Sequence, residues 1–140
     1  MKTIEKKIDT AEQRISKLKD LSRKISSFEE YATSRDYKDI AERNIQVAIE
    51  ACMDIGKIII ANQGLSEPSD NKSIFSVVAE AGIITKESLS FLMPMAGTRN
   101  ILVHGYDRID DALIYGIIKK HLNNFEDFLN QIRAYARNST

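Results

Sequence analysis

The chain has 140 residues, the length of about one domain, so we expect a single domain over 1–140. Its 43% hydrophobic and 29% charged residues, with only 6 glycines and 2 prolines, are typical of a compact folded protein and exclude a disordered one. The 20 lysines and arginines balance 20 aspartates and glutamates. This zero net charge excludes a broadly basic nucleic-acid binder of the histone kind, so any contact with a polyanion must be local.

The single cysteine and the N-terminal sequence indicate the compartment. Cys52 has no second cysteine with which to form an intramolecular disulfide. The N-terminal MKTIEKKIDT carries charges where a signal peptide needs a continuous apolar stretch. Apolar stretches such as IIIA at 58–61 are far shorter than the ~20 residues of a membrane-spanning helix. We therefore expect a cytoplasmic protein with no membrane partner.

Apolar residues in the N-terminal half recur at intervals of three and four, the period of an amphipathic helix. This period predicts a helix over about 3–31 and a second over about 36–61. The second is apolar over more of its circumference, which favours a central position in a bundle. Residues 62–73 are rich in glycine, proline, serine and asparagine and are expected to form a connecting loop.

The C-terminal half continues with helical periods. A short helix over SIFSVVAEA is expected, capped by Ser73, and a longer one capped by Thr85 should run to about His104 with a kink or break at Pro94. A last helix is predicted over about 110–132. Because no segment shows convincing strand alternation, the sequence predicts an all-α fold, an antiparallel bundle of four to five helices.

Most catalytic and metal-binding templates are missing from the sequence. It contains no CxxC, no HExxH and no glycine-rich phosphate loop, and one cysteine with two histidines cannot form a zinc set. We therefore expect no metal and no cofactor. Asp107, Asp110 and Asp111 could hold magnesium, but they lie where the start of a helix favours carboxylates, and the structural interpretation is preferred.

The segment RNILVHGY at 99–106 concentrates polar groups that are capable of chemistry: Arg99, Asn100, His104 and Tyr106. On an ideal helix, Asn100 and His104 share a face, whereas Arg99 and His104 point about 140° apart. Three arrangements could still join Arg99 to His104. The arginine reaches across, the helix is distorted near Pro94 or Gly105, or a second subunit completes the site.

An arginine and a histidine brought together could cleave RNA. Imidazole transfers protons near neutral pH, and a guanidinium holds a phosphate through paired hydrogen bonds and stabilises the charge that builds on a phosphorane. With the ribose 2′-hydroxyl as internal nucleophile, this pair needs no metal. The spacing alone leaves another interpretation open, in which Arg99 and His104 cap carbonyls or pair with acids while Asn100 holds the following loop.

The other candidate residues are interpreted structurally. His121 is expected at the surface, and Tyr31, Tyr37, Tyr115 and Tyr135 at helix surfaces. Cys52, Met93 and Met95 are expected to fill the core or an interface. Arg43 and Asn44 lie in the predicted central helix, where interhelix hydrogen bonding is favoured over a role in supporting the site.

Four segments in order resemble one family: ERNIQ at 42–46, AIEAC at 48–52, AGII at 81–84 and MAGTRNILVHGYD at 95–107. They resemble the HepT-like proteins of the HEPN superfamily, which are the toxin halves of prokaryotic pairs with a minimal nucleotidyltransferase. The resemblance covers roughly residues 38–133. It implies a HEPN-like helical homodimer with a cognate minimal nucleotidyltransferase antitoxin as partner.

The resemblance also implies roles for the polar residues of 99–106. Arg99 and His104 would be the catalytic residues of a metal-independent endoribonuclease of a type VII toxin–antitoxin pair, with Asn100 in support and RNA, tRNA among the candidates, as substrate. Two copies of the motif would line one cleft of the dimer. Tyr106 would accept AMP from the nucleotidyltransferase, which would silence the toxin by adding charge and bulk.

Two other functions stay open from the sequence. One is a non-catalytic helical module that binds nucleotide or substrate for a nucleotidyltransferase. The other is a structural bundle in which Arg99 and His104 are only caps. The presence of Arg99, His104 and Tyr106 together favours the nuclease.

Overall fold

The computed structural model describes residues 2–138, which form helices and connecting turns without a strand, so the predicted all-α class is confirmed. The α-helices are α1 (Lys2–Lys24), α2 (Phe28–Ala32), α3 (Arg35–Gln63), α4 (Asn71–Glu80), α5 (Leu89–His104), α6 (Asp111–Lys120) and α7 (Leu122–Asn138). Two short 3-10 helices, η1 (Lys86–Ser88) and η2 (Tyr106–Arg108), precede and follow α5.

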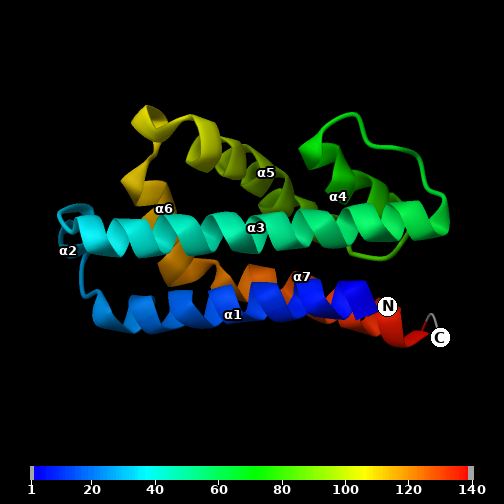
Figure 1. Ribbon diagram of the computed structural model, residues 1–140, viewed down its shortest axis with the longest axis horizontal. Helices are drawn as coiled ribbons and strands as arrows, with labels where there is room; N and C mark the ends of the chain where they lie inside the picture. The colour runs from blue at the N-terminus through cyan, green and yellow to red at the C-terminus, as the bar shows by residue number, and fades with distance from the viewer. Residues whose placement is uncertain (1, 139–140) are drawn as a thin grey trace.

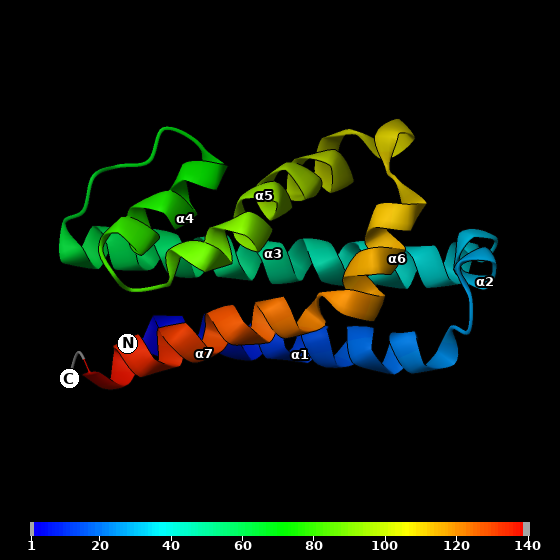
Figure 2. The same cartoon turned by 180° about the vertical axis from the view of Figure 1, so that it is seen from behind.

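Helix α3 lies at the centre of the bundle. It packs against α1 on one side and against α4 and α5 on the other, while α7 lies alongside α1 (Figure 1). The reverse view shows the same arrangement of helices around α3, and it shows α6 connecting the turn after α5 to α7 (Figure 2). Because α3 has neighbours on several sides, its buried residues occupy much of its circumference, as its predicted apolar character requires. Its buried Gly56 lies directly against Ile74 of α4.

The predicted first helix is wrong in its C-terminal third. Helix α1 ends at Lys24, and a short link leads to Ser27, whose hydroxyl accepts from the Glu30 amide and caps α2. The apolar period continues across the break because Ile25 is still buried in the link. The Nζ of Lys119 donates to the carbonyl oxygens of Ser22 and Ile25, 2.6 Å from each, and so satisfies backbone groups that a continued helix would have paired.

Three further boundaries differ from the expectation. The last predicted helix is divided at His121 into α6 and α7. The cap of α4 is Asp70, whose carboxylate accepts from the amide of Ser73, rather than Ser73 itself. Thr85 precedes the turn η1 and makes no side-chain cap, whereas α5 passes through Pro94 without a break.

The prediction for Tyr31 is wrong, whereas the prediction for Cys52 is confirmed. Tyr31 is fully buried rather than at a helix surface, and its ring lies 5.9 Å from that of Tyr115. Its hydroxyl has no hydrogen-bond partner within the described chain, and burial raises its pKa. Cys52 is buried as predicted, and burial raises the pKa of its thiol to about 12. A thiol of this kind is chemically inert at neutral pH.

Candidate active site

Helix α5 carries the candidate residues and buries only one of its sides. Leu92, Met95, Ala96, Thr98 and Leu102 are buried within the bundle. Pro94, Gly97 and His104 are exposed, and together with the half-buried Ile101 they follow the three-and-four spacing of one helix face. A Cβ built at Gly97 would meet no other part of the described chain within 4 Å. This outer face of α5, defined by Pro94, Gly97, Ile101 and His104, is therefore open.

Arg99 points toward α3 rather than along that outer face. Its Nε donates to Oε2 of Glu50, which lies in the middle of α3, over 3.0 Å. One Nη1 hydrogen is directed at Oδ1 of Asn100, 3.3 Å away. The Arg99 side chain is 25% exposed and that of Glu50 31%, so the ion pair lies at the rim of the α3–α5 contact.

His104 occupies the last turn of α5. The helix ends at Gly105, whose amide donates to the Ile101 carbonyl, and η2 begins immediately afterward. The Arg108 side chain then folds back over Gly105, where a Cβ would lie 3.0 Å from Nη2. His104 is exposed and forms no hydrogen bond or ion pair with any residue in 2–138. Its imidazole is therefore accessible to a ligand.

A single chain does not bring Arg99 and His104 together. Within the described residues no hydrogen bond or ion pair joins them, because Arg99 reaches Glu50 instead. The helix continues through Pro94 without a break, so no interruption of α5 there brings Arg99 and His104 together. Arg99 does pair with an acid, as the structural interpretation of the motif expects, whereas Asn100 contacts Arg99 rather than the following loop.

Tyr106 projects from η2 just beyond the end of α5, and 74% of its surface is exposed. It borders a cavity of about 380 Å³. The other lining residues come from the start of α3 and the segment leading into α6: Arg35, Lys38, Asp39, Glu42, Ile109 and Asp111. The charges in this wall are paired, since Arg35 binds Asp39 and Glu42 while Lys38 binds Asp111 over 2.9 Å. Tyr106 is thus an accessible hydroxyl beside a polar hollow.

The structure also tests the predictions for Arg43, Asn44 and His121. Asn44 is buried, donates to the Ile40 carbonyl and accepts from Arg14 of α1, so the predicted interhelix hydrogen bonding is confirmed for Asn44. Arg43 is exposed. His121 is at the surface as predicted, within 3.0 Å of Asn124.

The acidic residues near α6 have structural partners. The Asp110 carboxylate accepts from the amides of Ala112 and Leu113 and caps α6, and Asp111 binds Lys38. In the described part of the chain, no group of three or more His, Cys, Asp or Glu side chains is placed to hold a metal. None of the helices within residues 2–138 is both long and apolar enough to cross a membrane.

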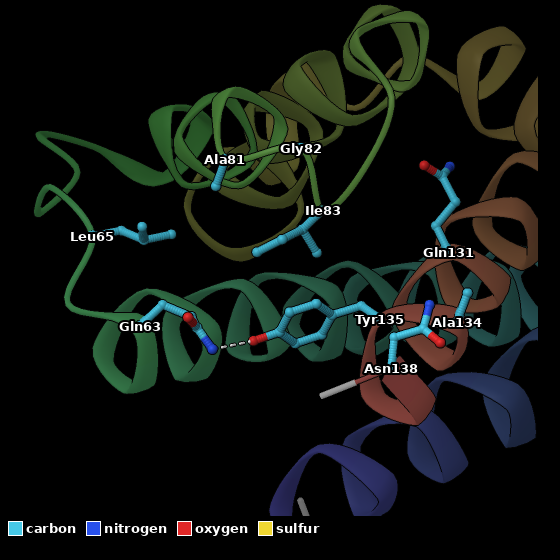
Figure 3. A pocket seen from close by; sticks show the side chains of 9 residues that line it. All are labelled: Gln63, Leu65, Ala81, Gly82, Ile83, Gln131, Ala134, Tyr135 and Asn138. Atoms are coloured by element: carbon cyan, nitrogen blue, oxygen red, sulfur yellow. Dashed lines mark hydrogen bonds between the residues drawn. The ribbon is translucent and has the colours of Figure 1, made fainter. Parts of the chain in front are cut away.

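A separate cavity of about 550 Å³ lies at the other end of α3 (Figure 3). Gln63, from the last turn of α3, donates to the Tyr135 hydroxyl over 2.6 Å across this hollow. Its remaining walls are apolar side chains and neutral amides, and none of the 99–106 residues lines it. It is therefore distinct from the candidate site.

Glu50 is the residue that sequence reasoning missed. Glu50 lies in the segment AIEAC, and the sequence predicted no function for it. A carboxylate within an otherwise apolar stretch was the one feature that could have indicated a partner. Its partner lies 49 residues further along the chain. Only the packing of α5 on α3 reveals the pair.

Comparison with known proteins decides the family. A family model described as ribonuclease HepT-like matches residues 11–132. The chain belongs to the HepT-like family. The match begins well before residue 38, where the sequence resemblance was expected to start, so α1 is part of the family's fold.

Individual HepT-like relatives agree with this assignment. The mRNA nuclease HepT of Shewanella oneidensis is 34% identical over 91 residues, covering 65% of this chain and 68% of the relative. The tRNA nuclease HepT of Aphanizomenon flos-aquae is 29% identical over 109 residues, covering 78% and 74%. The structure of the tri-AMPylated S. oneidensis HEPN toxin in complex with MNT antitoxin superposes with a TM-score of 0.84 at 28% identity, over 94% of this chain and 96% of that one.

Proposed function

We propose that this HepT-like protein is the ribonuclease toxin of a type VII toxin–antitoxin pair, and that it cleaves RNA without a metal through Arg99 and His104. The proposal rests on the imidazole of His104, which is exposed and has no side-chain partner within residues 2–138, on the same helix as Arg99. The family of this chain is described as a ribonuclease family. Its relatives are named for different RNAs, mRNA and tRNA. The substrate class is therefore RNA, and tRNA is one candidate within it.

The site requires a homodimer. Arg99 and His104 of one chain diverge by about 140° on the helix, and Arg99 is held at α3. The open outer face of α5 ends at His104, and no element within residues 2–138 covers Gly97 at its middle. A two-fold axis beside this face would place two copies of the motif in one cleft. Arg99 of one subunit would then face His104 of the other.

The proposed reaction uses the RNA itself as nucleophile. A neutral His104 imidazole takes the proton of the ribose 2′-hydroxyl, whose oxygen attacks the adjacent phosphorus. The Arg99 guanidinium stabilises the charge on the phosphorane oxygens. The bond from phosphorus to the 5′-oxygen breaks, and the same His104, now an imidazolium, returns the proton to the leaving oxygen. The products are a 2′,3′-cyclic phosphate and a 5′-hydroxyl.

Control of the toxin is assigned to Tyr106. A cognate minimal nucleotidyltransferase would transfer AMP to its hydroxyl, which is accessible because the side chain is 74% exposed. Tyr106 follows His104 by two residues, so the added phosphate and adenosine would lie beside the RNA cleft. Negative charge and bulk there would repel or block RNA. The related toxin in complex with MNT antitoxin supports this assignment because it is itself AMPylated.

RNA cleavage tests the nuclease directly. Purified protein incubated with total cellular RNA in EDTA should degrade it, whereas His104→Ala and Arg99→Ala should each lower the rate by about 100-fold or more. The matched control is His121→Ala, which removes the other surface histidine and should leave the rate unchanged. If the wild type and the His104 and Arg99 variants leave RNA equally intact, the nuclease is excluded and the non-catalytic partner of a nucleotidyltransferase is favoured.

Mass spectrometry tests the modification. Protein co-expressed with the nucleotidyltransferase encoded beside it should carry one or more AMP groups on Tyr106. The Tyr106→Phe variant should stay unmodified and remain toxic in the presence of the antitoxin, while Tyr37→Phe should behave as the wild type. A fully neutralised pair in which Tyr106 is unmodified would contradict this mechanism.

A substitution at Gly97 tests the dimer. Gly97→Arg places a long charged side chain on the open outer face, so sedimentation equilibrium should show a monomer and RNA cleavage should be lost. The single subunit should gain up to about 1 kcal/mol in free energy of unfolding, since arginine favours a helix more than glycine does. The control is Gly116→Arg in α6, where a Cβ also meets nothing within 4 Å of the described chain. An active, dimeric Gly97→Arg would place the interface elsewhere.

A further inference from the structure

We infer that Glu50 is a positioning residue, which holds the Arg99 guanidinium with its outer edge turned toward RNA. The inference rests on the proposed ribonuclease function. Oε2 of Glu50 accepts from Arg99 Nε over 3.0 Å and from Gln46 Nε2 over 3.4 Å. Gln46 lies one turn earlier on the same helix, so the carboxylate is itself restrained from its own side.

The two contacts of Arg99 determine which of its hydrogens remain for a ligand. A guanidinium has five N–H donors in a planar fork, and a phosphate is gripped by two donors on one edge. Glu50 occupies Nε and Asn100 one hydrogen of Nη1. The edge formed by Nε and Nη2 therefore cannot hold a phosphate with two donors. The second Nη1 hydrogen and both Nη2 hydrogens remain for a ligand.

The ion pair also explains how a long side chain can act with defined geometry. An unrestrained arginine samples many rotamers and loses that freedom when it binds substrate. Glu50 restricts the guanidinium before RNA arrives, so the donors are already placed where the phosphorane charge develops. At the same time its negative charge opposes RNA binding slightly. Removal of Glu50 should therefore lower kcat while KM stays the same or falls.

A second ion pair of α3 provides a matched control. Asp54, one turn beyond Glu50, binds Lys7 of α1 over 3.0 Å with 40% and 39% of the two side chains exposed. Both pairs join α3 to a neighbouring helix through comparable partly exposed contacts. Only Glu50 contacts Arg99. A general stabilising effect of such pairs would appear in both variants, whereas a positioning effect would appear only at Glu50.

The experiment measures kcat and KM in EDTA on a fluorogenic, mixed-sequence single-stranded RNA oligonucleotide. Glu50→Ala should lower kcat by about 10- to 100-fold, with KM unchanged or lower. Asp54→Ala should stay within about twofold of the wild type. Glu50→Gln keeps an acceptor oxygen and should lose less than Glu50→Ala. Combined with Arg99→Ala, the Glu50→Ala change should cause no additional loss, because Glu50 acts only through Arg99.

The outcomes separate the positioning role of Glu50 from the ribonuclease activity itself. A Glu50→Ala enzyme as active as Asp54→Ala overturns the positioning role and leaves the ribonuclease intact. A further loss of activity in the double variant overturns it as well, since Glu50 would then act through another group. If Glu50→Ala fails to fold, Glu50→Asp answers the question: positioning predicts a lower kcat, and wild-type kcat refutes it. A wild type that does not cleave the oligonucleotide overturns the proposed function and this inference together.

Discussion

The turn of an α-helix, about 100° for each residue, is the constraint from which the rest of the site follows. It separates Arg99 from His104 by about 140°, so one faces α3 and the other faces solvent. Arg99 is consequently held by Glu50, and His104 is left without a partner in the described chain. A single subunit carries both chemical groups but turns them in different directions. In the proposed mechanism they meet on one phosphate only across two copies of the chain.

Zero net charge is consistent with that arrangement. Most charges near the motif are already paired, as with Arg99 and Glu50, or Lys38 and Asp111. Such a surface offers few free cations, which in the proposed mechanism confines RNA to a small cleft doubled by symmetry. A small cleft is easily blocked. Because Tyr106 is exposed two residues after His104, AMP on its hydroxyl would change both the charge of the proposed cleft and access to it.

The sequence predicted the helical class and the central position of α3 because the spacing of apolar residues follows which side of a helix is buried. The predicted helix boundaries are wrong where buried residues continue through a break in the helix. Ile25 is buried in the link before α2, and the apolar spacing continues past His121, where α6 ends. The motif and the family resemblance predicted Arg99, Asn100, His104 and Tyr106 as the site residues, and this stays a prediction. The Glu50 contact could not be predicted, since it depends on how α5 crosses α3 and not on any local spacing.

In the proposed mechanism, Arg99 and His104 act together only across two subunits. A heterodimer of Arg99→Ala and His104→Ala chains, purified through two different tags, tests it most directly. One of its two possible trans pairs is intact, whereas each chain alone lacks one member of the pair. We expect the heterodimer to regain RNA cleavage well above either parent homodimer. A heterodimer as inactive as both parents would contradict it.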